Sequence, residues 1–180
     1  MAQAENAKKL DYTPVTYDDQ YILMVNQLKK YFPIKGGLMS QTVGHVKAVD
    51  GVTFNLKRGH TMGLVGESGC GKSVTSLSLM QLLQRPQGQI VQGEIRLNLG
   101  NGKAYDVAKT PGTVMQHLRG NYISMIFQEP MTSLNPVFRI GAQIDEVIAL
   151  HDGEGKSKED IKKRTVEMLE MVGIANSQGV

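Results

Sequence analysis

Eight consecutive residues carry the strongest chemical signal in this sequence: Gly66-Glu67-Ser68-Gly69-Cys70-Gly71-Lys72-Ser73. They match the spacing G-x-x-x-x-G-K-[ST], in which glycines let successive backbone N–H groups converge on a phosphate. Lys72 adds a positive charge for the outer phosphates, and the hydroxyl of Ser73 is a suitable ligand for Mg²⁺. The spacing therefore predicts a binding site for a nucleoside triphosphate.

The segments on either side of this loop supply the elements that it needs. Upstream, the apolar run Thr61–Val65 predicts a buried strand. Downstream, Pro86 ends a predicted helix, and its apolar residues at helical spacing are Val74, Leu77, Met80 and Leu83. Strand, loop and helix follow in the order that places a phosphate at a helix N-terminus.

Composition and charge describe an ordinary globular chain. It has 180 residues, of which 41% are hydrophobic and 21% charged, enough for one domain or part of a larger one. The net charge is only +3, and the densest basic cluster, Lys158–Arg164, lies on a helix with an apolar opposite face, which indicates a solvated surface rather than a nucleic-acid site. Cys70 is the sole cysteine, so a reducing compartment fits.

Targeting signals are weak at the N-terminus. Met1–Asp11 is polar and lacks the apolar stretch of a secretory signal, and the apolar run Tyr21–Val25 is too short to span a bilayer. We therefore expect a protein of the cytoplasm or of the cytoplasmic face of the membrane, attached there through a partner.

The first half of the chain predicts strands around the loop: Tyr21–Phe32, Val46–Leu56 and Gly88–Leu99. Residues 1–20 are expected to form a mobile arm. Pro33 and a Gly36-Gly37 turn are predicted to end the first strand. Gly100-Asn101-Gly102 predicts a hairpin after the third.

The second half is predicted to be mainly helical. A short helix is expected within Lys109–Arg119, and the compact strand Tyr122–Phe127 follows it. A helix over Ile140–Leu150 is broken at Gly153-Glu154-Gly155. Ser157-x-x-Asp160 resembles a capping box and predicts a last helix that stops at Gly173.

A second motif spans residues 127–136, Phe-Gln-Glu-Pro-Met-Thr-Ser-Leu-Asn-Pro. It places Gln128 at the end of a predicted buried strand, the edge where ligands bind in α/β sheets. An amide both donates and accepts, so Gln128 suits the orientation of a water molecule or a place in a metal shell. Alone, the stretch would be read as a strand-to-helix loop, but a phosphate-binding loop precedes it.

These two motifs resemble the ATP-binding subunit of ABC transporters, and more narrowly the oligopeptide/dipeptide (and nickel) importer group. The stretches Leu28–Pro33 and Val46–Val52 are similar to that group's adenine-stacking loop and following strand. The resemblance implies an α/β fold, a P-loop NTPase core of the ABC ATPase type with an N-terminal antiparallel β subdomain and the start of a helical subdomain. It implies a division into an arm (1–20), a nucleotide-binding core with P-loop and Q-loop (21–136) and a partial helical subdomain (137–180).

The same resemblance implies the site. Residues 66–73 bind the phosphates of ATP, with Lys72 on the β- and γ-phosphates and Ser73 on Mg²⁺. Gln128 is the Q-loop residue that senses Mg²⁺ and the attacking water, so Gln128 and Lys72 are the catalytic candidates. Phe32 stacks on adenine, with Tyr31 as the alternative. Val74 stands where many members have threonine and contributes its backbone N–H alone.

Three parts of that family's site do not occur in this sequence. There is no Leu-Ser-Gly-Gly-Gln-like segment, no apolar strand ending in Asp-Glu and no late switch histidine; Asp145-Glu146 follows a stretch that is not an apolar strand and is expected on a helix surface. We therefore expect an N-terminal fragment without its C-terminal part, able to bind Mg-ATP weakly and to hydrolyse it very slowly or not at all. The resemblance implies as partners the permease subunits, a second ATP-binding subunit and, indirectly, an extracytoplasmic solute-binding protein, with no nucleic acid.

Other classes fit less well. A P-loop GTPase would carry an Asn-Lys-x-Asp segment, and none occurs. A soluble ABC-type ATPase shares the P-loop chemistry and stays open, as does a truncated remnant without enzymatic activity. The transported solute is not encoded in these residues.

Overall fold

The computed structural model describes residues 15–36, 41–83, 90–127, 133–152 and 155–174. The chain forms two compact units, Met1–Ile123 and Ser124–Val180, and each is described by itself. The predicted division at residues 20 and 136 stays a prediction.

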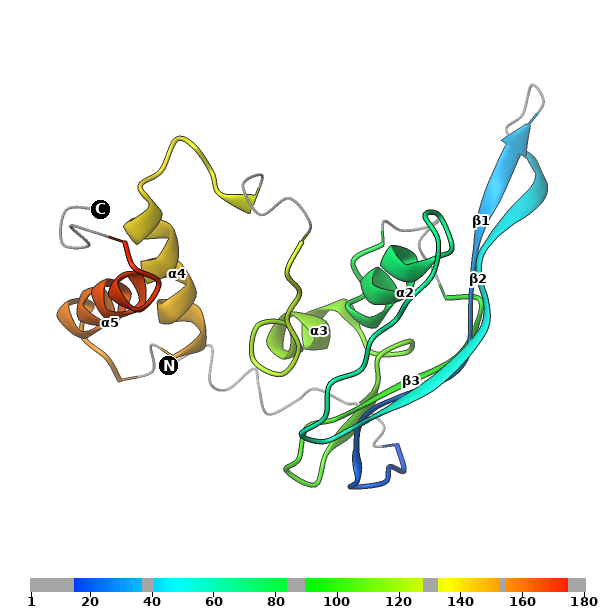
Figure 1. Cartoon of the computed structure of the whole chain (residues 1–180), viewed down its shortest axis with the longest axis horizontal. Helices are drawn as coiled ribbons and strands as arrows, with labels where there is room; N and C mark the ends of the chain where they lie inside the picture. Colours follow the sequence, from blue (N-terminus) through cyan, green and yellow to red (C-terminus); the bar gives the residue numbers. More distant parts are fainter. Residues whose placement is uncertain (1–14, 37–40, 84–89, 128–132, 153–154, 175–180) are drawn as a thin grey trace. The chain divides into compact units, whose positions relative to one another are not determined.

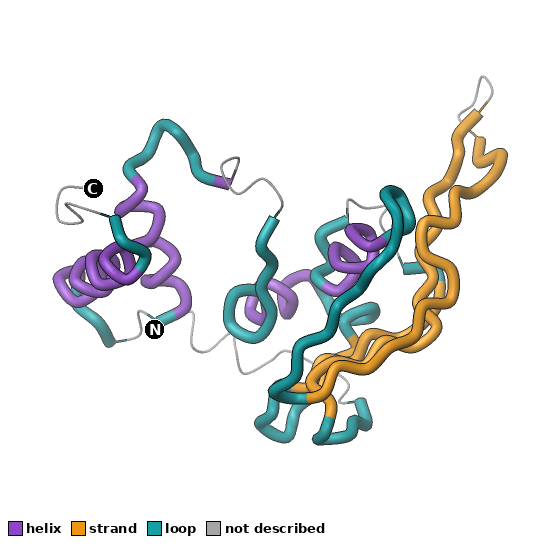
Figure 2. Tube along the Cα trace, in the orientation of Figure 1, coloured by secondary structure: helices purple, strands orange, loops and turns teal. Residues whose placement is uncertain are grey.

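An antiparallel sheet is the frame of the first unit (Figures 1 and 2), and its strand order is β2-β1-β3-β4. The strands are β1 (Tyr21–Gly36), β2 (Gln41–Lys57), β3 (Gln92–Asn98) and β4 (Ala104–Asp106). The β3–β4 hairpin turns through residues 99–103, where the Leu99 amide donates to the Lys103 carbonyl (3.0 Å), so the hairpin predicted at Gly100-Asn101-Gly102 is confirmed.

Two short helices, α2 (Lys72–Leu79) and α3 (Gly112–Leu118), pack on one face of this sheet. The helix expected within Lys109–Arg119 is thereby confirmed as α3. Apolar side chains alternate along β1 and β3, so that one face of the sheet is dry and the other polar. The buried cluster consists of Leu23, Val25, Leu28, Val49, Ile95, Leu97, Tyr105, Val107, Val114, Met115 and Leu118.

A β-bulge at Asn26 and Gln27 interrupts the alternation in β1. The pairing with β2 passes from Val25–Phe54 to Leu28–Val52, so two residues of β1 oppose the single residue Thr53. Gln27 has a φ of 48°, and its backbone N–H donates to the Thr53 hydroxyl (2.9 Å). Because the bulge inserts one extra residue, the buried positions of β1 change from odd-numbered residues before it (Leu23, Val25) to even-numbered residues after it (Leu28, Lys30).

The strand β1 is longer than predicted, because Pro33 does not end it. Pro33 pairs with His45, and the ladder continues to Gly36 opposite Gln41. The neighbour on the other side, β3, pairs with β1 only as far as Lys29. Beyond that point no described strand pairs with this edge of β1, and a residue without an N–H is tolerated there.

Two predicted strands, Thr61–Val65 and Tyr122–Phe127, are not strands in the structure. Within the described ranges neither segment joins a ladder, apart from an isolated bridge between Arg119 and Ile123. The side chains of Val65 and Ile126 are 90% and 93% exposed. Apolar runs of this kind become buried strands only when neighbouring strands pair with them. The prediction of strands at these two segments was therefore wrong.

The helix α2 ends earlier than Leu83, the last apolar residue of its predicted repeat. The Gln81 amide donates to the Ser78 carbonyl (3.1 Å) and the Leu82 amide to the Leu77 carbonyl (2.9 Å). Gln81 has a φ of 49°. These bonds and this left-handed residue form a Schellman end, which the sequence concealed because the position that usually holds glycine holds glutamine.

The second unit contains the helices α4 (Ile140–His151) and α5 (Lys158–Met171), which pack on one another. The predicted helix at Ile140–Leu150 is confirmed, and Asp145-Glu146 lies within it. The capping box is also confirmed, because the Asp160 amide donates to the Ser157 hydroxyl (3.1 Å) and the Ser157 amide to the Asp160 carboxylate (3.0 Å). Gly173, with a φ of 79°, ends α5 as expected. Over the residues that the structure describes, no helix has both the length and the apolar character of a membrane span.

Candidate nucleotide-binding site

The loop Gly66–Ser73 lies between the extended segment 61–65 and the first turn of α2. A turn within it is closed by the Cys70 amide, which donates to the Glu67 carbonyl (3.3 Å). Gly71 is the N-cap of α2 and has a φ of 89°, with no side chain bonded to the cap. The first N–H groups of α2 are therefore left to a ligand, and the helix dipole favours a negative one.

Gly71 packs directly against the backbone of β2. A Cβ placed on Gly71 would lie 2.3 Å from the carbonyl oxygen of Ala48 and 3.5 Å from Cγ2 of Val49. The β1–β2 pairing passes from Lys30–Val49 to Tyr31–Lys47, so Ala48 is the extra residue of another register shift in the hairpin. The displaced carbonyl of Ala48 and the missing side chain of Gly71 together fix the start of α2 on the sheet.

Lys72 lies over the loop that it belongs to. Its Nζ donates to the carbonyl oxygens of Gly66 (2.7 Å) and Glu67 (2.8 Å) and lies 3.5 Å from Sγ of Cys70. The ammonium is thus held where the glycine-rich turn opens to solvent. This position puts a positive charge at the mouth of the predicted phosphate site.

The first turn of α2 exposes one hydroxyl and buries another. The side chain of Ser73 is exposed, whereas Thr75 is buried and donates from its amide (2.8 Å) and its hydroxyl (2.9 Å) to the Gly71 carbonyl. Val74 is partly buried and packs against the core cluster. Ser73 therefore supplies the accessible hydroxyl oxygen of this turn.

The two candidate aromatic residues lie on opposite faces of β1. Lys30 pairs with Val49, whose side chain contacts the Gly71 position, and the Lys30 Nζ lies 4.1 Å from the centroid of the Phe32 ring. Lys30, Val49 and Phe32 therefore share the face on which α2 packs. Tyr31 points to the other face, because neighbouring residues of a strand alternate.

Tyr31 is occupied by polar partners on its own face. Its hydroxyl donates to the Asp50 carboxylate (2.5 Å), and the Lys47 ammonium lies 3.3 Å from Asp50 and 5.5 Å from the centroid of the Tyr31 ring. The hydrogen bond to Asp50 raises the pKa of Tyr31 and lowers the pKa of Asp50. This face of the hairpin carries a closed polar cluster rather than a free ring.

Gln128 lies outside the described residues, so its predicted place beside the phosphates stays a prediction. Its predecessor Phe127 is 48% exposed. No group of three or more His, Cys, Asp or Glu side chains suited to a metal ion occurs in the part of the chain that the structure covers.

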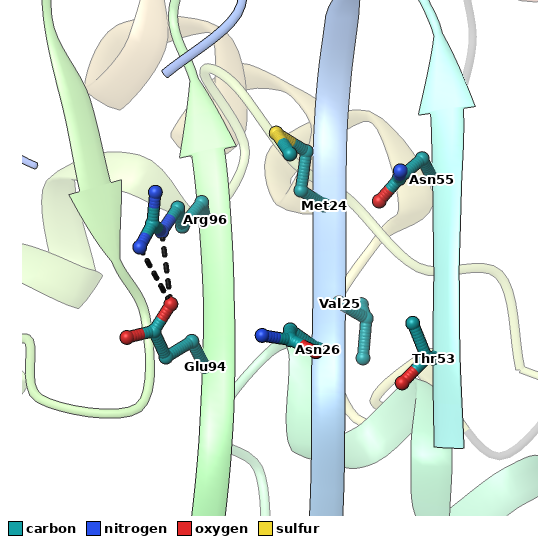
Figure 3. Close-up of a pocket in the computed structure, with 7 residues that line it drawn as sticks. All are labelled: Met24, Val25, Asn26, Thr53, Asn55, Glu94 and Arg96. Carbon is teal, nitrogen blue, oxygen red and sulfur yellow. Dashed lines mark hydrogen bonds and ion pairs between the residues drawn. The ribbon is translucent and has the colours of Figure 1, made fainter. Parts of the chain in front are cut away.

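A pocket of about 200 Å³ lies on the polar face of the sheet, away from the loop (Figure 3). It lies across β1, β2 and β3, and the ion pair between Arg96 and Glu94 (2.7 Å) borders one side of it. The lining residues are Met24, Val25, Asn26, Thr53, Asn55, Glu94 and Arg96. It shares no residue with the loop Gly66–Ser73.

The family model of the ABC transporter matches residues 49–179 of this chain. The chain therefore belongs to the ABC transporter family. It is similar in fold to the ATP-binding cassette MJ0796, solved as a dimer in a post-hydrolysis state bound to ADP and Pi, with a TM-score of 0.66 and 19% identity over 86% of this chain and 58% of that one. The α/β P-loop fold predicted from the sequence is thereby confirmed.

Among named relatives, the chain is 44% identical over 159 residues to the oligopeptide transport ATP-binding protein AppD of Bacillus subtilis, covering 88% of this chain and 44% of AppD. It is 51% identical over 131 residues to OppD of the same organism, covering 73% of this chain and 35% of OppD. It is 47% identical over 133 residues to a putative peptide import ATP-binding protein of Brucella ovis, with 74% and 39% covered. The chain spans less than half the length of these relatives.

Sequence reasoning missed two residues that shape the site, Ala48 and Lys30. Ala48 looked like an ordinary strand residue, and only the pairing reveals that its carbonyl is displaced toward Gly71. The sequence did contain one indication for Lys30. It lies two residues before Phe32 and therefore on the same face of the strand, and a lysine on a buried face is rare.

Proposed function

We propose that this chain is the nucleotide-binding part of the ATP-binding subunit of a peptide-type ABC importer. The observation that carries the proposal is the Gly66–Ser73 loop at the start of α2, with the Lys72 ammonium over its carbonyls and Gly71 seated on β2. Family membership and the names of the relatives support the importer class over a soluble ATPase. We propose ATP hydrolysis and transport for the whole subunit, since this chain spans under half the length of those relatives.

The phosphates would bind along the loop and the N-terminal turn of α2. The glycine amides and the helix N–H groups donate to phosphate oxygens, and Lys72 exchanges its carbonyl partners for the β- and γ-phosphates. In phosphoryl transfer most of the rate enhancement comes from such positioning and charge neutralisation. The residues proposed for this role are Gly66, Glu67, Ser68, Gly69, Cys70, Gly71, Lys72, Ser73 and Val74, the last through its backbone N–H.

Magnesium would be held by the Ser73 hydroxyl together with Gln128. When bound, the ion neutralises charge on the β- and γ-phosphates and orients them. Gln128 would position the attacking water through its amide, and its loop would carry the signal to the membrane partner.

Adenine would stack on Phe32. The ring lies on the face of β1 that also contacts Gly71 through Val49, whereas Tyr31 is bonded to Asp50 on the other face. An aromatic face accepts a purine without hydrogen bonds, by offset stacking. Phe32 is therefore favoured over Tyr31.

The proposed partners are a second ATP-binding subunit and the permease subunits, with an extracytoplasmic solute-binding protein acting through the permease. The dimeric form of MJ0796 supports a paired arrangement for the fold, and the relatives' names support a peptide as cargo. The place of action would be the cytoplasmic face of the membrane.

Calorimetric titration with Mg-ATP tests the nucleotide site. The unaltered chain should bind, Lys72→Ala should lose binding, and Lys103→Ala, an exposed lysine in the β3–β4 turn, should bind like the parent. Binding that is equal in Lys72→Ala and the parent would refute the site. Co-purification with membrane proteins from the native host separates the importer from a soluble ATPase.

A further inference from the structure

We propose that Lys30 is a positioning residue that fixes the ring of Phe32 for stacking with the nucleobase. This inference rests on the proposed function, in which Phe32 contacts adenine. It adds a determinant of base affinity that lies underneath the ring rather than beside the nucleotide.

The side chain of Lys30 is fully buried, with an exposed fraction of 0%. Its Nζ lies 4.1 Å from the centroid of the Phe32 ring and donates to the Tyr31 carbonyl (2.9 Å). A cation at this distance from a ring face is attracted to the negative side of the aromatic quadrupole, and more strongly where water is excluded. Lys30 therefore ties together the side chain of Phe32 and the backbone that precedes it.

A buried lysine carries a desolvation cost that the contacts of its ammonium must offset. Burying an ammonium group disfavours its charged form, and burial accordingly lowers the pKa of Lys30. A leucine or methionine would fill the same space without that cost, as Leu28 does one period earlier on the same face. What an apolar side chain would not supply is a directional contact that holds a neighbouring ring in one orientation.

The ring has two faces, and Lys30 takes one of them. Phe32 is only partly buried, and its cross-strand neighbour Val46 is 54% exposed. In this proposal, a flat base stacks on the face of the ring away from the ammonium. A phenylalanine near the end of a long hairpin would otherwise rotate among rotamers, and holding it in advance lowers the entropy lost on stacking.

The test compares ligands with and without a base. Mg-ATP and Mg-tripolyphosphate are titrated into the parent chain, Lys30→Met, Phe32→Ala and the double variant, with Lys29→Met on the opposite face as the matched control. Lys30→Met should weaken Mg-ATP by roughly 3- to 10-fold and leave tripolyphosphate unchanged. It should have no further effect once Phe32 is alanine, and Lys30→Arg should restore most of the affinity.

The outcomes separate this inference from the proposed function. Phe32→Ala without effect on Mg-ATP would refute adenine stacking, and with it the role of Lys30. A different result would overturn only the positioning role. In it, Phe32→Ala weakens the binding of Mg-ATP but not of Mg-tripolyphosphate, whereas Lys30→Met binds both ligands like the parent or weakens both equally.

A second measurement needs no ligand and covers a variant that fails to fold. In the free chain, the ring current of Phe32 should shift the Lys30 ε-protons upfield in the NMR spectrum, and Phe32→Leu should abolish the shift. Lys30 ε-protons at ordinary lysine positions would overturn the inference.

Discussion

Gly71 and Ala48 approach so closely that the carbonyl oxygen of Ala48 occupies the space of a β-carbon on Gly71, 2.3 Å from its ideal position. A contact between strand and helix backbones thus sets the start of α2. The position of the loop Gly66–Ser73 is therefore set by β2 as well as by its own sequence.

Gly71→Ala should destabilise the fold far more than Gly69→Ala. Gly71 combines a φ of 89° with a backbone atom in the way, whereas Gly69 has a φ of 80° and open space around it. We expect Gly69→Ala to cost about 1–2 kcal/mol of unfolding free energy and Gly71→Ala about 3 kcal/mol or more. Urea unfolding and Mg-ATP titration of both variants measure this, with Gly63→Ala as the unstrained control. Equal losses at Gly69 and Gly71 would contradict the contact.

Cys70 should report on loop occupancy. It is the sole cysteine, it is exposed, and it lies within the phosphate-binding turn. A bound triphosphate covers this turn, so Mg-ATP should slow alkylation of Cys70 by iodoacetamide several-fold. Mass spectrometry follows the modification with time. Lys72→Ala should show no protection, and protection that persists in that variant would place the nucleotide elsewhere.

Arg119 should stabilise the far end of the P-loop helix. Its guanidinium donates to the carbonyl oxygens of Met80 (2.8 Å) and Gln81 (3.0 Å), where α2 ends. Removing a charged donor from two carbonyls should cost about 2 kcal/mol in Arg119→Met. Arg119→Lys should retain part of this, since lysine donates from a single point. Chemical unfolding of the variants decides, and equal stability of the parent and Arg119→Met would contradict the role.

The capping box of α5 should be sensitive to acid. Hydrogen bonds from the Ser157 hydroxyl and amide lower the pKa of Asp160 from its ordinary value of 3.8. A lowered pKa means that the ionised carboxylate stabilises the folded state above about pH 4, and that this contribution is lost as pH falls through the lower, folded-state pKa. NMR titration of the Asp160 carboxyl should show the shift, and Ser157→Ala should bring the pKa back toward 3.8. An unchanged pKa in that variant would refute the cause.

Local chemistry was readable from the sequence wherever a few adjacent residues determine the outcome. The Ser157–Asp160 capping box, the turn at Gly100-Asn101-Gly102 and the stop of α5 at Gly173 each depend on neighbours within four residues. The loop Gly66–Ser73 also has a local signature, and its role in phosphate binding stays a prediction. These features were predicted from residue type and spacing alone.

Features that depend on distant partners were not readable. Gln81 and Gly173 occupy the same position in the two Schellman ends. Glycine is the usual residue there, so only the end at Gly173 could be predicted from the sequence. Pro33 continues a strand because β3 has already ended beside it. The apolar run Thr61–Val65 was wrongly predicted to be a strand. A strand needs a neighbouring strand to pair with, and the residues of the run do not show whether one is present.

The position of Lys72 has a consequence for how its contribution is measured. Its ammonium already has two carbonyl partners in the loop, Gly66 and Glu67, so a triphosphate replaces bonds rather than adding them. Lys72→Ala removes the hydrogen bonds that the ammonium makes to the free loop, and it also removes the charge that would contact the phosphates. The affinity lost in Lys72→Ala is therefore a difference between two sets of contacts, and it is smaller than the full strength of the contacts between Lys72 and the phosphates.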